Sequence, residues 1–208
     1  GEGLTSGTYN TAVGIHALDA GLGTGDHNVA IGRSSLSANT SGSYNVALGS
    51  SALASNSSAE HNTAFGHGAL YTNSTGDNSI AIGSYALYHQ NPSGGASVDM
   101  HNVAVGYDAG QQTTTGIKNC YLGNYAGRSG TDAAENVALG YYSLYTNVSG
   151  AYNTAIGYHS LKASTSSSNT AIGYESQRGL TTGDLNVSVG KGTLYTNTVG
   201  DRNVAIGA

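Results

Sequence analysis

A five-residue motif, Asn-x-Ala-Ile-Gly or a close variant, recurs along the whole chain at a nearly constant interval. Its closing glycines lie 16 to 18 residues apart, with one interval of 23 residues between Gly83 and Gly106. This period is too short for helical repeats of about 33 to 47 residues, and it predicts one coil of a β-solenoid. The twelve motifs are marked by Asn10 and Gly14, Asn28 and Gly32, Asn45 and Gly49, Asn62 and Gly66, Gly83 alone, Asn102 and Gly106, Asn119 and Gly123, Asn136 and Gly140, Asn153 and Gly157, Asn169 and Gly173, Asn186 and Gly190, and Asn203 and Gly207.

The motif predicts a short strand with two different faces. Alternate residues of a strand point to opposite sides, so the second and fourth motif residues (Val, Thr, Ile, Leu) share one face, and Asn, Ala and Gly share the other. A small residue followed by Leu, as in Ala52-Leu53, starts three residues after most of the glycines. We expect the large face and this Leu to fill the interior of the coil. The small Asn/Ala/Gly face is then free to pack closely against another copy of the chain.

The recurring Asn suits both the entry of a strand and a stacked array. Asn tolerates the left-handed backbone region and bonds to nearby backbone. Stacked coils would also align these side chains in a ladder, in which each amide bonds to the next. One copy departs from the pattern, because Ser79 takes the place of Asn. Twelve coils at a strand spacing of about 4.8 Å form a rod of roughly 55–60 Å, and so thin a rod is expected to associate.

The composition separates this chain from ordinary globular, membrane and nucleic-acid-binding proteins. Charged residues make up 9% of the chain, against about 25% in a typical soluble domain. The net charge is −5 and the seven Lys and Arg are scattered singly, which predicts no nucleic-acid partner. No apolar run reaches the roughly 18–20 residues of a membrane helix, so we expect no membrane insertion by this segment. The single Cys120 excludes an intrachain disulfide and is expected to be a small buried apolar residue.

The repeated residues, such as Asn169-Thr170-Ala171-Ile172-Gly173, resemble the head repeats of trimeric autotransporter adhesins, the YadA-like head. The resemblance covers nearly the whole chain. It implies an all-β fold, a left-handed parallel β-roll (a β-solenoid) of about twelve coils, and a homotrimer with the roll axes parallel to the threefold axis. Repeats with Tyr after the glycine, as at Tyr158 and Tyr174, also look like those of phage tail-fibre proteins.

The resemblance further implies a setting on a cell surface or virion surface, outside the cell. Residues 1–208 are expected to form a single YadA-like head repeat domain, a segment of a longer fibre or adhesin. The chain departs from the adhesin pattern by its longer period near 17 and by the long interval before Gly106, and we expect no stalk, neck or membrane anchor within residues 1–208. These departures leave both a bacterial adhesin and a phage or other contractile-system fibre open.

The long interval before Gly106 is one candidate for a binding surface. It adds six residues to the usual period, and loops on rigid scaffolds often carry binding. A surface insertion without any role is the alternative, because long loops are thermodynamically tolerated. The candidate residues in this interval are Tyr88, His89, Asn91, Pro92 and Met100.

Aromatic residues in register with the motif are the second candidate. One column immediately precedes the Asn of the motif, and Tyr and His recur in it, as at Tyr9 and His27. The other follows the glycine and contains Tyr107, Tyr141, Tyr158 and Tyr174. Aligned rings beside Asn, Ser and Thr would suit a cell-surface glycan or protein. The alternative is that the rings only stabilise neighbouring coils.

The sequence shows no constellation for catalysis, and we expect neither an enzyme nor a cofactor. Glu2, Glu60, Glu135 and Glu175 fall at unrelated coil positions, unlike the paired carboxylates of glycan-cleaving enzymes. Recurring His without paired Cys or carboxylates argues against a metal site. We therefore expect a structural or adhesive module of a trimeric adhesin or fibre, which mediates or presents attachment to a cell surface. The alternatives are a tail-fibre spacer without binding activity and an ice-binding solenoid, although Thr-x-Thr is only sporadic here.

Overall fold

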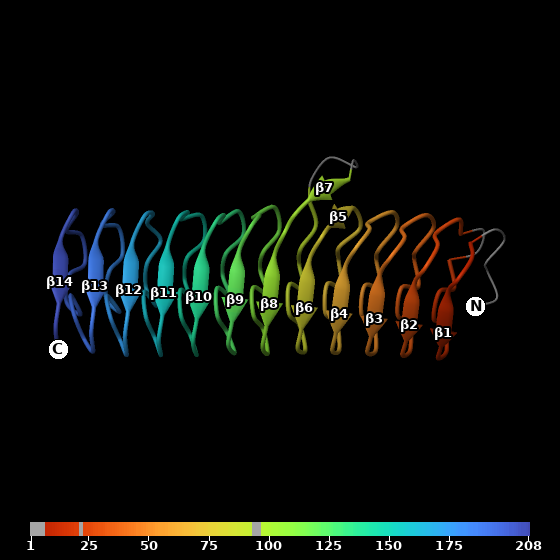
Figure 1. Cartoon of the computed structure of the whole chain (residues 1–208), viewed down its shortest axis with the longest axis horizontal. Helices are drawn as coiled ribbons and strands as arrows, with labels where there is room; N and C mark the ends of the chain where they lie inside the picture. The colour runs from red at the N-terminus through yellow and green to blue at the C-terminus, as the bar shows by residue number, and fades with distance from the viewer. Residues whose placement is uncertain (1–6, 21–22, 93–96) are drawn as a thin grey trace.

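The chain forms a row of stacked coils built around one parallel sheet. The computed structural model describes residues 7–20, 23–92 and 97–208. Twelve strands pair in chain order, separated by eleven turns of a parallel β-solenoid (Figure 1), which confirms the predicted all-β solenoid. The strands are β1 (Thr11–Val13), β2 (Val29–Ile31), β3 (Val46–Leu48), β4 (Thr63–Phe65), β6 (Ile80–Ile82), β8 (Val103–Val105), β9 (Cys120–Leu122), β10 (Val137–Leu139), β11 (Thr154–Ile156), β12 (Thr170–Ile172), β13 (Val187–Val189) and β14 (Val204–Ile206).

Each of these twelve strands consists of the second, third and fourth residues of the motif, so the coils stack in register. Ala81 of β6 pairs with Ala104 of β8 even across the longer interval. The closing glycine of each motif turns the chain with φ between 129° and 142°. At Gly83 a Cβ atom would also lie 2.4 Å from the carbonyl oxygen of Gly106 in the next coil. Glycine is therefore required both by the turn and by the close approach of the coils.

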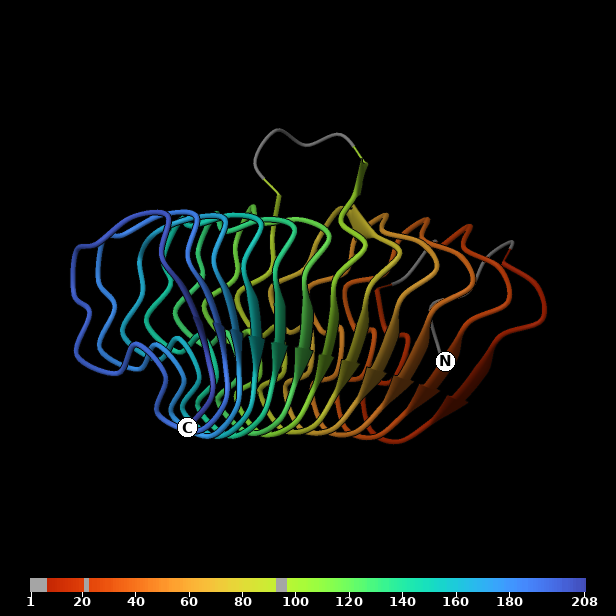
Figure 2. The same ribbon diagram turned by 60° about the vertical axis from the view of Figure 1, so that its left-hand side comes forward.

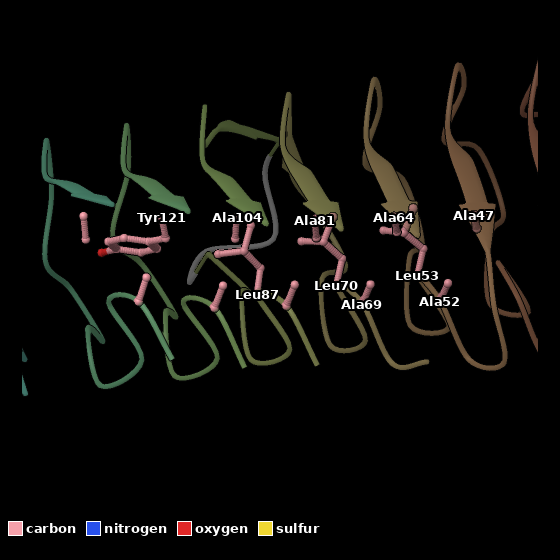
Figure 3. Packing of buried hydrophobic residues seen from close by; sticks show 14 of the residues in the cluster. Ala47, Ala52, Leu53, Ala64, Ala69, Leu70, Ala81, Leu87, Ala104 and Tyr121 are labelled. Carbon is pink, nitrogen blue, oxygen red and sulfur yellow. The ribbon is translucent and has the colours of Figure 1, made fainter. Parts of the chain in front are cut away.

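The prediction of which strand face points inward is wrong. The third motif residue lies inside, where Ala64 is fully buried beside Leu53 of the turn (Figure 3). The second and fourth residues point outward, and Leu122 and Leu139 are each 43% exposed. A coil of this size has room for one layer of Leu opposite a small residue, because protein interiors are close-packed. Only the predicted burial of the Leu is confirmed.

The Asn of the motif also points inward and forms the predicted ladder. The side-chain oxygen of Asn119 accepts the backbone N–H of Asn136 at 3.0 Å, and Asn136 accepts that of Asn153 at 2.9 Å. The side-chain amide of Asn136 donates to the buried carbonyl of Gly150 at 2.8 Å. The left-handed conformation expected at Asn falls instead on the preceding residue, such as Tyr44 with φ 59°. The ladder thus pairs backbone groups that the interior would otherwise leave unsatisfied.

The segment that carries the buried Leu is a turn. Leu36 and Leu53 have φ of 48° and 49°, a left-handed conformation that costs a side-chain-bearing residue roughly 1–2 kcal/mol. The backbone N–H of Leu36 donates to the carbonyl of Ala52 in the next coil, and that of Leu53 donates to Ala69, both at 3.0 Å. Burying each Leu contributes about 1.5–3 kcal/mol. The hydrogen bonds between stacked coils and the burial of the Leu side chain together offset the cost of the left-handed conformation.

In one coil the large core residue lies on the strand and the small one lies in the turn, the reverse of most other coils. Tyr121 of β9 stands where most other strands have Ala, and its ring is buried (Figure 3). In this coil and the preceding one, the Leu positions are taken by Gly127 and Gly110. A Cβ atom at Gly127 would lie 2.3 Å from the tyrosine ring, and one at Gly110 would lie 2.7 Å from it. The ring therefore fills the space that two Leu side chains fill elsewhere.

Near the C-terminal end of the rod, polar residues take the places of two apolar core residues. Ser188 of β13 replaces the motif Ala, and Gln177 replaces the Leu of the adjacent turn. The side-chain amide of Gln177 donates to the hydroxyl of Ser188 at 2.9 Å. Three residues after Gln177, Leu180 is fully buried at the position that holds Asn147 in an earlier coil. Core positions thus change in matched pairs, polar with polar and large with small.

The longer interval projects from one side of the rod. At its base, β5 (Gly76–Asp77) and β7 (Val98–Asp99) pair as a separate two-stranded parallel sheet (Figures 1 and 2). Residues 93–96, which belong to the predicted insertion, lie outside the described residues, as does Glu2. Because β6 and β8 still pair directly, the sheet of the rod continues past the projection.

Beside this projection, Gln90 bridges the position at which the Asn ladder is interrupted by Ser79. Ser79, which replaces the Asn, is too short to bridge to the next coil. The amide nitrogen of Gln90 donates to the hydroxyl of Ser79 at 3.1 Å, and its side-chain oxygen accepts from the amide of Asn102 at 2.9 Å. The replacement of Asn by Ser79 is therefore compensated by Gln90, which lies eleven residues later in the chain.

Candidate binding surface

Three of the four tyrosines predicted after the motif glycine form a stack. The rings of Tyr141 and Tyr158 have centroids 5.6 Å apart, and those of Tyr158 and Tyr174 are 5.1 Å apart. Tyr107 lies two coils away from Tyr141, and its ring meets the edge of Tyr125 at 5.4 Å. All four predicted tyrosines are 40–48% exposed. They are accessible to a partner, and three of them form a continuous row.

Two further columns of tyrosine widen this surface, and neither was predicted from the sequence. They lie two and five residues after the motif glycine, and this recurrence is the sequence signal that marks them. Tyr125 stacks on Tyr142 at 4.7 Å, and Tyr142 packs on Tyr145 at 4.7 Å. Burial and neighbouring tyrosines raise the pKa of Tyr125 and Tyr142, so both hydroxyls stay protonated and can donate hydrogen bonds. The two columns contain Tyr85, Tyr125 and Tyr142, and Tyr71, Tyr88, Tyr145 and Tyr195.

Four of the seven basic residues lie on the same surface, although they are scattered singly in the sequence. Each places its charge over a tyrosine ring, an arrangement worth about 0.5–1 kcal/mol at an exposed site. The distances from charge to ring centroid are 5.9 Å for Arg128 and Tyr145, 5.3 Å for Lys162 and Tyr142, 5.6 Å for Arg178 and Tyr195, and 5.9 Å for Lys191 and Tyr174. We call these residues, with Tyr107, Tyr125, Tyr141 and Tyr158, the tyrosine–basic strip.

The electrostatic balance of the strip is positive near His159. Burial, followed by the charges of Lys162 and Arg178, lowers the pKa of His159, although Glu175 acts in the opposite direction. The carboxylate of Glu175 lies 3.8 Å from the His159 ring and 3.4 Å from Nε of Arg178. Among the described residues, no carboxylate lies within 4 Å of the Lys162 ammonium. This part of the strip is locally cationic in a chain whose net charge is −5.

A groove opens beside these two cations. It has a volume of about 290 Å³ and is lined by Thr146, Lys162, Ala163, Arg178 and Gly179. The lining residues come from three successive coils. Because Ala163 and Gly179 carry little or no side chain, space remains between the long side chains of Lys162 and Arg178.

The residues predicted in the long interval do not form one exposed site. Pro92 and Met100 are buried, so the prediction that they belong to a binding surface is wrong. Both pack close to Gly76 of β5, where a Cβ atom would lie 2.9 Å from Met100 and 3.1 Å from Pro92. Asn91 is exposed, and its side-chain oxygen accepts the hydroxyl of Ser74 at 2.6 Å. The apolar residues of the interval anchor the projection to the rod.

Tyr88 and His89 belong to the rod rather than to the projection. Both are partly buried. The ring of Tyr88 stacks on Tyr71 of the preceding coil at 4.9 Å, and His89 meets its edge at 4.8 Å. Burial and the neighbouring tyrosines raise the pKa of Tyr88. These two residues extend the tyrosine columns toward the N-terminal coils.

A separate aromatic stack follows the column that precedes the Asn. Tyr9, His27, Tyr44 and His61 stack in order with centroid separations of 4.7, 5.0 and 5.0 Å. The row ends at the next coil, where Asn78 holds the position. In the described part of the chain, no group of three His, Cys, Asp or Glu side chains is placed to hold a metal ion.

The outward side chains of the sheet form a second candidate surface, which we call the outer sheet face. The fourth motif residue is Val, Ile, Leu or Phe in all twelve strands. Thr occupies only four of the twelve second positions, Thr11, Thr63, Thr154 and Thr170, so this face has no continuous rank of Thr. Cys120 lies here and is exposed, and the prediction that it is buried is wrong because the second motif position points outward.

Comparison of this chain with models of protein families, with curated proteins and with solved structures found no match. Over the residues that the structure describes, no helix is long and apolar enough to cross a bilayer. Function is therefore inferred from the geometry of the outer sheet face and the tyrosine–basic strip.

Proposed function

We propose that this chain is a non-catalytic structural and adhesive module, a self-associating rod within a surface adhesin or fibre that mediates or presents attachment to a cell surface. The outer sheet face is the observation that carries this proposal. The proposed setting is outside the cell, on a cell or virion surface. The proposed partners are other copies of the chain and a cell-surface glycan or protein.

The outer sheet face supports self-association because it leaves apolar side chains in water along the full length of the rod. Leu122, Leu139 and Ile172 are 37–43% exposed, and their counterparts continue on every strand. Monomeric proteins rarely expose contiguous apolar patches larger than a few hundred Å². Covering such a patch contributes about 25 cal/mol per Å² of apolar surface removed from water.

Another copy of the chain is the partner that best matches this face in length and in repeat. We propose three copies, each a left-handed roll, with their axes parallel to the threefold axis. The interface is formed by the Val/Ile/Leu face, in contrast to the Asn/Ala/Gly face expected from the sequence. That small face lies inside the coil and is closed to a partner.

Light scattering on the purified chain tests the association. We expect a trimeric mass for the unmodified chain and a monomeric mass for Leu122→Glu/Leu139→Glu, because two buried carboxylates would oppose the interface. The matched control is Val148→Glu/Val199→Glu, which places the same charges on exposed apolar residues outside the sheet. A monomeric unmodified chain at micromolar concentration would refute self-association, and a monomeric control would show that the charge itself, and not its place, disrupts the assembly.

A spacer without binding activity is the second candidate, favoured by the mutual stacking of the tyrosines. Such stacking stabilises neighbouring coils and needs no partner. Binding of the trimer to cells distinguishes the two roles. Adhesion that is lost in Tyr141→Ser/Tyr158→Ser, while the trimeric mass is kept, supports the adhesive module. A trimer that binds no cell surface supports the spacer.

A further inference from the structure

We infer that the groove between Lys162 and Arg178 binds a carboxylate-bearing sugar of an acidic glycan. The inference deepens the proposed adhesive function and rests on it. It is carried by three features: two cations that line the groove, the space between them, and an accessible tyrosine ring, Tyr195, beside Arg178.

The two cations give the groove its preference for an anion. The ammonium of Lys162 has no carboxylate within 4 Å among the described residues. Arg178 shares the single carboxylate of Glu175 at 3.4 Å and also donates to the hydroxyl of Tyr195. One net positive charge therefore remains at the groove. The lowered pKa of His159, caused by burial and by these two cations, is consistent with a positive local potential.

The cavity and its surroundings suit a sugar ring. Its volume of about 290 Å³ is near the lower end of the roughly 300–1,000 Å³ that small-molecule sites occupy. Tyr195 and Tyr174, which contact the guanidinium of Arg178 and the ammonium of Lys191, are 38% and 48% exposed. An amphipathic ring offers an apolar face to the C–H groups of a sugar and a hydroxyl to its oxygens.

The arrangement of charge favours a sparsely charged polymer over a nucleic acid. The four cations of the tyrosine–basic strip are separated by tyrosines, and Asp108 and Glu175 lie among them at 3.2 Å and 3.4 Å from Arg128 and Arg178. A polyphosphate backbone presents closely spaced charges and binds through clusters of Lys and Arg. The net charge of −5 would also repel a dense polyanion. A glycan with one carboxylate in every few sugars fits this spacing.

Binding measurements on the intact chain with three probes test the inference. The probes are an oligosaccharide that contains uronic acid, the same oligosaccharide with its carboxylates reduced to alcohols, and single-stranded DNA of similar length. We expect the carboxylated oligosaccharide to bind, the reduced form to bind at least tenfold more weakly, and added salt to weaken binding. Dissociation constants from calorimetry provide the readout.

Two double variants locate the site. Lys162→Gln/Arg178→Gln is expected to weaken binding of the carboxylated oligosaccharide by about tenfold or more, as loss of two charge-assisted contacts would. The matched control, Arg33→Gln/Arg202→Gln, removes two exposed basic residues elsewhere and is expected to bind as the unmodified chain does.

Equal loss in the control variant, equal binding of the reduced oligosaccharide, tighter binding of DNA, or no binding of the carboxylated probe would each overturn the inference. Light scattering on the same samples separates this outcome from failure of the proposed function. A trimer that fails to bind the sugar removes only the inference, whereas a monomer removes the proposed assembly.

Discussion

The two faces of one strand carry different kinds of stabilisation. In β10, Ala138 and the preceding Asn136 point inward and are fully buried, whereas Val137 and Leu139 point outward and are 39% and 43% exposed. The inner face is determined by volume and by hydrogen bonds, because only Ala fits opposite the Leu and only an amide completes the ladder. The outer face is apolar but makes no comparable contacts within the chain. In a thin coil, therefore, the larger apolar residues do not mark the interior.

Removing one Asn of the ladder is expected to give the largest difference in the free energy of unfolding between an inner-face and an outer-face substitution. Asn136→Ala leaves the buried N–H of Asn153 without its side-chain partner, at a cost of about 1–3 kcal/mol. It also removes the hydrogen bonds that the Asn136 amide donates to Asn119 and to the carbonyl of Gly150, which keeps a donor in Asn147. With about 0.5–1.5 kcal/mol for each of these two bonds, we expect a loss of roughly 2–6 kcal/mol in the free energy of unfolding. Val137→Ala, on the outer face of the same coil, should cost less than about 1 kcal/mol.

Urea unfolding in the Leu122→Glu/Leu139→Glu background measures both variants without the contribution of association. Equal losses for Asn136→Ala and Val137→Ala would contradict the distinction between the inner and outer faces.

Removing the Tyr121 ring from the core at β9 is expected to cause the next largest loss in the free energy of unfolding. Tyr121→Ala removes a buried ring that no neighbouring side chain can replace, and we expect a loss of about 3–5 kcal/mol. Adding Gly110→Leu and Gly127→Leu should recover most of this loss. Both glycines have φ of 58°, close to the 48–52° of the buried Leu residues of other coils such as Leu36 and Leu70.

A thermodynamic cycle of these variants, measured by urea unfolding, gives the coupling between the ring and the two glycines. If the triple variant is no more stable than Tyr121→Ala alone, the ring does not occupy the space of the two Leu side chains.

Left-handed positions on the outside of the turns should respond more weakly. Ser34 has φ of 56°, and Gly68 holds the equivalent position two coils later with φ of 64°. Ser34→Gly relieves the left-handed strain and is expected to stabilise the chain by about 0.5–1 kcal/mol. Ser58→Gly, at a position without positive φ, should destabilise it by a similar amount. Thermal unfolding that moves in the same direction for both variants would exclude backbone strain as the cause.

The smallest expected effect is a dependence of stability on pH through His159. Its folded pKa lies below the ordinary value of 6.5, because of burial and the charges of Lys162 and Arg178, with Glu175 opposing them. As the pH falls through 6.5, the unfolded chain takes up the proton first, so stability falls and continues to fall until the pH passes below the folded pKa. His159→Gln should flatten the stability profile between about pH 7 and pH 5. An unchanged slope in that variant would assign the dependence to other groups.

The sequence predicted the architecture because a period near 17 allows few other folds, and it predicted the Asn ladder and the buried Leu because both recur in register. It did not predict the direction of the strand faces, since alternation gives two faces without saying which is inside. Cys120 was misplaced for the same reason. Arg128, Lys162 and Arg178 were seen as isolated charges because their proximity is created by the stacking of coils. The burial of Pro92 and Met100 depends on β5 and β7, which no sequence pattern indicated.

Reaction of the Cys120 thiol with a maleimide reagent tests most directly whether the outer sheet face points outward and is covered by other copies. Cys120 is the only cysteine, and it lies in the middle of that face. We expect slow labelling in the unmodified trimer and fast labelling in the monomeric Leu122→Glu/Leu139→Glu variant under native conditions. Slow labelling in both would place the thiol inside the coil, and fast labelling in both would show that the face is not covered. Either result would contradict the proposed interface.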